Sequence, residues 1–286
     1  MTTLTARTLP RPAVLGRLRR VDWILVTSSA VLLIAVVAAV APGLLTSVDP
    51  LLADPLATLQ SPSAEHLAGT DLQGRDVFSR IVHGARYSLA IGAGATLLGL
   101  LLGLLVGAAA AVGPGWLDRL LSRTVDVIAA FPEVLLALVL ITFTSRGVPN
   151  LILALGIAGI PRYSRLIRTQ ILQTQTTGYV GQAHTFGLGR VRTLTRHVLP
   201  NALGALPVVA TIGLGGAIIG SSALSFLGLG PQQPSPEWGL MLSDSRDYLR
   251  HAWWTGVLPG LALTAVVIAA TALGRRLQAR YERRTR

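Results

Sequence analysis

Two acidic residues lie within an otherwise apolar stretch of the sequence. Asp126 and Glu133 are seven residues apart, so on a helix they share a face, about 20° short of two full turns. An ionisable side chain at the centre of a membrane helix costs about 2.5–3.5 kcal/mol on insertion scales, so it should face protein or water. Two interpretations stay open: carboxylates that line a path and meet a charged amine, or an internal ion pair with an arginine such as Arg162 or Arg165.

Most residue types that enzymes use for covalent or metal chemistry are absent or isolated. All 25 basic residues are arginine, and the chain contains no lysine and no cysteine. This excludes a P-loop lysine, a Schiff base and thiolate chemistry. The histidines stand singly, so a zinc hydrolase is not expected. If ATP is used, another chain hydrolyses it.

One short pattern points to a different chemistry. The run Gly220-Ser-Ser222-Ala223 matches the G-x-S-x pattern of intramembrane serine proteases, with His251 as the candidate base. The pattern has only four residues, and His251 lies in a loop rather than on a facing span. A serine protease is therefore a minor alternative.

The composition is typical of a membrane protein. Of 286 residues, 51% are hydrophobic and only 13% are charged, whereas soluble domains carry about a quarter charged residues. The mean hydropathy is +0.57. The net charge of +12 is better explained by arginines that flank membrane spans than by a nucleic-acid partner, and none is expected.

We predict an all-α, polytopic integral membrane protein, in contact with lipid, with six transmembrane helices of roughly 20 residues. The spans are Trp23–Leu45 and residues 87–112, 125–145, 148–169, 203–228 and 253–274. The first apolar run is longer than the 7–15 residues of a signal-peptide core, so we expect an uncleaved helix. The fourth span is the weakest, because Pro161-Arg162 interrupts it. Counting this segment as a span places most arginines on one side of the membrane. Because arginines gather on the cytoplasmic side, both termini are expected to face the cytoplasm.

Small residues recur at helical spacing in two spans. Such rows let a neighbouring helix approach closely, and the second row is also compatible with a bend of the backbone. The rows are Ala95, Gly99, Gly103, Gly107 and Ala111, and Gly213, Gly215, Gly216 and Gly220.

Four patches of the sequence resemble one family of transporters. They are residues 66–92, with His66-Leu-Ala-Gly69-Thr-Asp71-Leu-Gln-Gly74-Arg75-Asp76; Asp126–Leu138, with Phe131-Pro132; Tyr179–Asn201, ending His197-Val-Leu-Pro200-Asn201; and Leu224–Gly230, followed by Trp238-Gly-Leu-Met-Leu242 and Tyr248. In this order the patches resemble the C-type permease subunit of the dipeptide/oligopeptide/nickel ABC importers.

The resemblance implies an ABC importer type I permease fold and ATP-driven peptide import by alternating access. It implies a second related permease, two ATPase subunits or one fused ATPase, and an extracytoplasmic substrate-binding protein. The chain itself would be no enzyme and hold no cofactor, since ATP and Mg²⁺ bind the partner ATPases. Its place would be the bacterial cytoplasmic (inner) membrane. A nickel or other small-solute importer is the nearest alternative, and a secondary transporter is a less favoured one.

The resemblance also divides the chain. We expect a basic cytoplasmic tail over residues 1–20 and a first helix with an extracytoplasmic loop over 21–85. A transmembrane core of five helices would cover residues 86–275, with an ATPase-docking loop at 170–202. A second basic tail would cover residues 276–286.

In the docking loop, exposed side chains of a short helix would insert into a groove of the ATPase. The coupling residues implied are Tyr179, Val180, Gln182, Ala183, Phe186 and Gly187. The family usually has a glutamate where this chain has Gly181, which leaves the strength of coupling open. The alternative is an amphipathic connector lying on the membrane surface.

On the outer side, Asp71, Arg75 and Asp76 are expected either to shape a gate or receive the binding protein, or to form a self-contained loop. Ser225 and Phe226 end the fifth span, where Phe226 is either a gate or an aromatic anchor. Three tryptophans are expected as interfacial anchors: Trp238, Trp253 and Trp254.

Overall fold

The computed structural model describes residues 22–178, 180 and 188–282, and within these ranges the chain is helical, with one isolated β-bridge between Thr70 and Asp76. The long helices are α1 (Trp23–Val40), α2 (Val77–Val112), α3 (Gly115–Ile128), α4 (Glu133–Thr142), α5 (Val148–Gln175), α9 (Leu206–Phe226), α10 (Trp238–Ser245) and α11 (Trp254–Glu282). Short turns are η1 (Pro42–Leu44), η2 (Pro55–Ala57), α7 (Arg190–Thr193), η3 (Leu194–Val198), α8 (Leu199–Ala202) and η4 (Leu203–Ala205).

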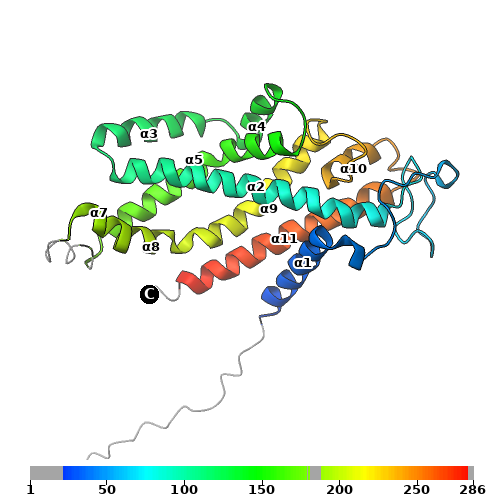
Figure 1. Ribbon diagram of the computed structural model, residues 1–286, viewed down its shortest axis with the longest axis horizontal. Helices are drawn as coiled ribbons and strands as arrows, with labels where there is room; N and C mark the ends of the chain where they lie inside the picture. Colours follow the sequence, from blue (N-terminus) through cyan, green and yellow to red (C-terminus); the bar gives the residue numbers. More distant parts are fainter. Residues whose placement is uncertain (1–21, 179, 181–187, 283–286) are drawn as a thin grey trace, which may run out of the picture.

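The long helices form an elongated bundle in which successive long segments run in opposite directions (Figure 1). The helices α2, α5, α9 and α11 follow the long axis, and α1 packs obliquely on α11 and α2. One end carries α7, α8 and the end of α11, and the other carries α10 and the connection between α1 and α2. The core therefore lies between α2, α5, α9 and α11.

Among the described residues, four helices are long and apolar enough to cross a membrane, namely α1, α2, α9 and α11, and a fifth span results if α3 and α4 are counted together. The 28-residue α5 is long enough to span, but it carries Arg162, Arg165 and Arg168. Six spans therefore stay a prediction. Contrary to expectation, Pro161 does not interrupt α5, which continues through it.

The third expected span is not one straight helix. The helices α3 and α4 meet at an angle of 87° across residues 129–132. Pro132 is the residue before α4, and a proline there cannot donate a hydrogen bond to the preceding turn and clashes with it. The prediction that Asp126 and Glu133 share a face of one helix was wrong, because they lie on different helices, α3 and α4.

The rows of small residues act as close-packing surfaces. A Cβ atom at Gly103 would lie 2.5 Å from the Cβ of Tyr163 on α5, and one at Gly107 would lie 3.1 Å from the Cα of Ser164. A Cβ atom at Gly213 would collide with the Tyr163 hydroxyl. Because α9 is continuous through its glycines, their role is contact with α5 and α11 rather than a bend.

Candidate functional site

Three ion pairs join α5 to the bent segment α3–α4. Arg162 pairs with Glu133 and Arg165 with Asp126, in the latter case over 2.8 Å. Nearer the end of α5, Arg168 pairs with Asp118. The three arginines are three residues apart on α5, so the pairs form a polar track that starts midway along the helix and runs toward its C-terminal end. The ion pairs offered as one interpretation of Glu133 and Asp126 are present in the structure. Their role in lining a path stays a prediction.

The track is open on one side of the chain. The Arg162 and Glu133 side chains are 48% and 34% exposed, and those of Arg165 and Asp126 are 54% and 56% exposed. If α5 is the predicted fourth span, these charges face protein or water rather than lipid, because exposing a charge to lipid costs several kcal/mol. This face of α4 and α5 is therefore covered by water or by another chain.

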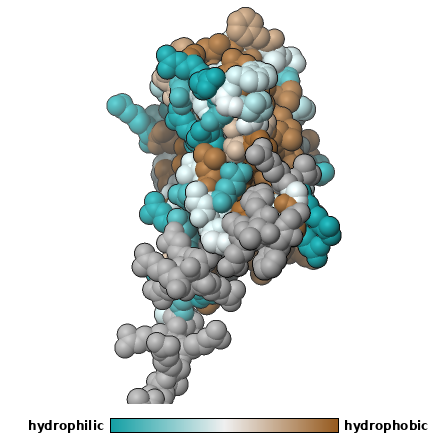
Figure 2. All heavy atoms as spheres, turned by 90° about the vertical axis from the view of Figure 1, so that its left-hand side faces the viewer, coloured by the Kyte–Doolittle hydropathy of each residue, from teal (hydrophilic) through white to brown (hydrophobic). Residues whose placement is uncertain are grey.

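A cavity of about 320 Å³ lies beside the track, between α2, α3 and α5. Its polar walls include Asp126, Arg165 and Arg168, and its apolar wall includes Gly107 and Val125. Viewed from this end of the bundle, hydrophilic residues gather at the upper left, and hydrophobic residues lie along the top and the right (Figure 2). This end of the bundle is thus mixed in polarity.

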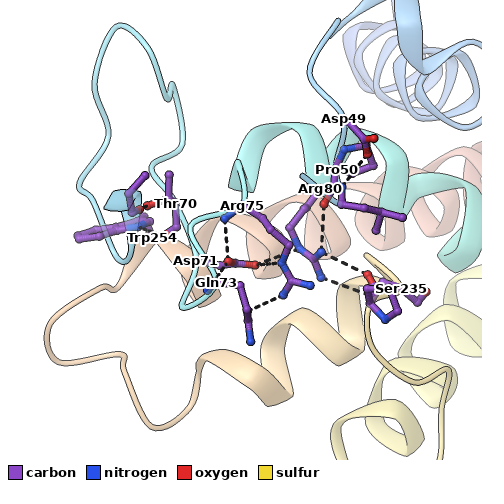
Figure 3. A network of polar contacts seen from close by, with 12 residues as sticks. Asp49, Pro50, Thr70, Asp71, Gln73, Arg75, Arg80, Ser235 and Trp254 are labelled. Atoms are coloured by element: carbon purple, nitrogen blue, oxygen red, sulfur yellow. Dashed lines mark hydrogen bonds and ion pairs between the residues drawn. The ribbon is translucent and has the colours of Figure 1, made fainter. Parts of the chain in front are cut away.

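At the opposite end, a buried arginine ties three segments together. Arg80 is 1% exposed and donates to the carbonyl oxygens of Pro50, Pro234 and Ser235 over 3.2–3.3 Å. Its Nε also lies 3.4 Å from a carboxylate oxygen of Asp71 (Figure 3). Nothing in the sequence around Arg80 distinguished it from other arginines; its role arises from loops about 30 and 150 residues away.

The three acidic and basic residues predicted on the outer side all have partners within the loop. Asp71 accepts from Arg75 Nε over 2.7 Å, and Arg75 Nη2 donates to Gln73 (Figure 3). Asp76 caps α2 by accepting from the Ser79 amide over 2.6 Å, and it pairs with His66 over 2.9 Å. This geometry is that of the self-contained loop, while a gating or docking role stays untested.

Two of the three tryptophans are not interfacial anchors. Trp238 is buried and donates from Nε1 to the Ile81 carbonyl, and Trp254 is buried and donates to the Thr70 carbonyl. They tie α10 and α11 to the region where α2 begins, which hydropathy alone does not reveal. Trp253 is exposed, as an anchor would be.

The end of α9 packs against a carboxylate that the sequence did not single out. Ser225 is fully buried, whereas Phe226 is 41% exposed. Glu237 caps α10 by accepting from the amides of Gly239 and Leu240, and it also accepts from Ser88 of α2. Burial raises the pKa of the Glu237 carboxyl, against the lowering effect of these amides. A gating role of Phe226 stays a prediction.

The docking segment is described only in part. Tyr179, Gln182, Ala183, Phe186 and Gly187 lie outside the described residues. Val180 is 2% exposed and packs in a cluster with Tyr163, Ile167, Ile171, Val198 and Ala202. The expectation of an exposed Val180 was therefore wrong, because α5 and α8 present an apolar face that takes up its side chain. Whether the segment couples to an ATPase is untested.

The serine protease alternative gains no support from the geometry. Ser222 is buried, and its Oγ has no hydrogen-bond partner in the described part of the chain. A serine nucleophile needs a base within hydrogen-bond reach. His251 is exposed in the loop before α11 and does not supply one.

Residues 99–286 match the family described as binding-protein-dependent transport system inner membrane component. The chain is 40% identical over 259 residues to the dipeptide transport system permease protein DppC of Alkalihalophilus pseudofirmus, covering 91% of this chain and 83% of the relative. It is 39% identical to the di/tripeptide transport system permease protein DppC of Pseudomonas aeruginosa, over 77% of this chain and 73% of the relative. The chain belongs to this family of permeases.

Solved structures support the same fold for the permease. The MetNI methionine ABC transporter, in an inward-facing conformation, matches with a TM-score of 0.59 at 23% identity, over 69% of this chain and 94% of that chain. An amino acid ABC transporter with histidines matches with a TM-score of 0.57 at 16% identity, over 72% and 94%. The all-α importer permease fold is thereby confirmed.

Membership in the family defines the protein at a coarse level. It is a multi-pass component of the inner membrane and the permease of an ABC importer, so it functions with an ATPase and other components of that system. It is not itself a catalyst, because ATP hydrolysis belongs to a separate subunit.

Proposed function

We propose that this permease imports peptides, dipeptides and oligopeptides among them, by alternating access driven by ATP hydrolysis on partner subunits. The observation that carries the proposal is the 40% identity to a dipeptide permease over 91% of the chain. The di/tripeptide permease and a glutathione permease of Pectobacterium atrosepticum, 38% identical over 75% of this chain, fall in the same chemical class of cargo.

The assembly would contain a second related permease, two ATPase subunits or one fused ATPase, and an extracytoplasmic binding protein. The chain would hold no cofactor of its own, since ATP and Mg²⁺ are bound by the ATPases. Both termini would face the cytoplasm, which is supported by the arginine bias and by the alternating directions of the long helices (Figure 1). The polar face along α4 and α5 suits a wall of the path, because it needs water or protein over it.

Within this assembly, residues 170–202 would receive the motion of the ATPase. Closure of the ATPases on ATP would favour the outward-facing state of the path over the inward-facing state, because the ATPases would contact the docking segment differently in the two states. Phe186→Asp should uncouple ATP hydrolysis from uptake while the protein stays in the membrane. Normal uptake by that variant would contradict the coupling assignment.

The decisive test has two steps. The permease, tagged at Arg286, is purified in mild detergent from its own membranes, and the copurifying chains are identified by mass. A second permease and a Walker-motif ATPase are expected. Uptake of radiolabelled Ala-Ala and of nickel is then compared in cells with and without the permease gene. Loss of dipeptide uptake alone supports the proposal, and loss of nickel uptake alone would replace peptides with nickel as the cargo.

A further inference from the structure

The pair formed by Arg162 and Glu133 has an unusual position for a structural ion pair. Arg162 lies about 21 Å along α5 from Val148, at 1.5 Å per residue. With α5 as the predicted fourth span, this depth falls inside a hydrocarbon core about 30 Å thick. Both side chains are nevertheless partly exposed, at 48% and 34%. An ion pair this exposed contributes little to holding α4 against α5.

Two glycines lie next to the pair. A Cβ atom at Gly159 would lie 3.8 Å from Oε1 of Glu133, and one at Gly216 of α9 would lie 3.6 Å from Nη1 of Arg162. The two glycines put bare backbone beside the charged groups, so no side chain from either position fills the space around them. Three helices, α4, α5 and α9, thus meet around one positive and one negative group that are both partly exposed.

The pair nearest the C-terminal end of α5 differs from this one. Arg168 donates from Nε and Nη2 to both carboxylate oxygens of Asp118, over 2.7 Å each, which holds α3 against α5. Arg162 donates to a single oxygen of Glu133. A bidentate pair is the stronger and more rigid arrangement. The Arg162–Glu133 pair, like the Arg165–Asp126 pair with its single hydrogen bond, is therefore suited to open and close, and of the two it lies nearer the middle of α5.

We propose that Arg162 and Glu133 determine specificity for the charged ends of a peptide, by exchanging their ion pair for two ion pairs with the cargo. Arg162 takes the α-carboxylate and Glu133 takes the α-ammonium. The inference rests on the proposed peptide import. It adds a positive residue to the path and assigns each end of the cargo to one side chain.

The exchange conserves charge at every step. A free peptide brings one positive and one negative group, and each finds an opposite partner while the protein pair opens. When the cargo leaves, Arg162 and Glu133 pair again, so neither charge stays unpaired in a low-dielectric region, which would be costly. A dipeptide is at most about 7 Å long, a separation that the long side chains of arginine and glutamate can bridge by changing rotamers. The net gain in binding free energy is small, because the ion pair within the protein is lost when the cargo binds. A transport path needs such weak binding, since the cargo must also leave.

The test uses the permease–ATPase complex in nanodiscs without the binding protein, so that only the path is measured. Binding of radiolabelled Ala-Ala is competed with unlabelled Ala-Ala, N-acetyl-Ala-Ala and Ala-Ala-amide. The wild-type complex should prefer the free dipeptide over each blocked form by about tenfold. Glu133→Gln should abolish the preference over the N-acetyl form only, and Arg162→Gln should abolish the preference over the amide only.

Two double variants guard against loss of folding. Glu133→Gln with Arg162→Gln leaves no unpaired charge, so the complex should assemble and lose both preferences. Arg246→Gln with Asp247→Asn removes an exposed pair outside α4 and α5 in the same way and should keep both preferences. A wild-type complex without a preference for free ends, or a Glu133/Arg162 double variant that retains it, would overturn the inference.

The outcome for the proposed function is read separately, from uptake by cells that carry the unaltered permease. If those cells import Ala-Ala but binding shows no selectivity for free ends, peptide import stands and only the roles of Arg162 and Glu133 fall. If they import no peptide, both proposals fall.

Discussion

Arg168 of α5 holds both carboxylate oxygens of Asp118 on α3, through Nε and Nη2 over 2.7 Å each. This pair lies on the far side of the 87° bend from α4, so α3 is fixed to α5 independently of α4. A cavity of about 320 Å³ stays open beside it. The ion pair therefore helps to hold α3 against α5, beside the packing of α3 on α2.

Arg168→Lys should loosen α3, because an ammonium group cannot match both oxygens of a carboxylate as a guanidinium does. Both partners are about one-third exposed, so we expect a loss of about 1 kcal/mol or less in the free energy of unfolding. Thermal unfolding in detergent measures it. The more exposed Arg165→Lys is the matched control and should have a smaller effect. Equal effects of the two variants would contradict the special role of Arg168.

Arg80→Met should destabilise the protein strongly, since it leaves Asp71 without one cation and removes the donor to three carbonyl oxygens. Removing one member of a buried charged network costs about 3–5 kcal/mol. The measurement is the amount of folded protein in the membrane together with the unfolding temperature. Arg246→Met, at a side chain that is 60% exposed, is the control and should change neither. A stable Arg80→Met variant would show that the loops do not depend on this residue.

Gly103→Ala should weaken the packing of α2 on α5. The added methyl group would lie 2.5 Å from the Cβ of Tyr163, so the helices must separate, at a cost of about 1–3 kcal/mol. Gly115→Ala is the control, because its Cβ would meet only Arg119 Nη1, at 3.6 Å. Unfolding temperatures of the two variants are compared. If Gly103→Ala unfolded at the same temperature as the control, the close approach of α2 and α5 would not contribute to stability.

Asp244→Asn should flatten the pH dependence of stability. Burial raises the pKa of Asp244 above its ordinary 3.8, although Gln233 and the charges of Arg80 and Arg75 act in the opposite direction. At a pH between the ordinary pKa of the unfolded chain and the raised pKa of the folded protein, the folded protein keeps a proton that the unfolded chain loses. The free energy of unfolding therefore falls as the pH rises between these two pKa values, and it stays lower at higher pH.

Asparagine has no proton to lose, so the variant should be more stable than the wild type above the window. In the wild type, Oδ2 of Asp244 is buried without a hydrogen-bond partner in the described structure, so replacing this oxygen by the amide group breaks no hydrogen bond. Unfolding temperatures from pH 4 to 8 measure the effect. Asp247→Asn, at an exposed side chain, should leave the profile unchanged. A steeper fall of the unfolding temperature with pH in Asp244→Asn than in the wild type would contradict the prediction.

Several predictions from the sequence are confirmed because they depend on local composition. Apolar runs long enough to span a bilayer predicted α1, α2, α9 and α11. The small residues of α2 predicted a close helix contact, which is made with α5. The arginine partners proposed for Asp126 and Glu133 are those found, since α5 supplies them at helical spacing.

Other features depend on contacts between segments far apart in the chain. Val180 is buried by α5 and α8, and Trp238 and Trp254 are buried by the loops that meet at the start of α2. Arg80 gains its partners from residues about 30 and 150 positions away. Hydropathy gives the tendency of a residue to leave water, but not which segment will cover it.

The sequence by itself determined a polytopic all-α membrane protein, because composition and the lengths of apolar runs suffice for that, while the resemblance of its motifs implied a permease whose partners supply the chemistry. Only the tertiary structure decided that the acidic pair is split by a bend at Pro132, that each acid meets its own arginine, and that these two pairs are partly exposed. The physical reason is that a helix period places side chains on a face, whereas a break between helices and the packing of three helices decide what that face meets.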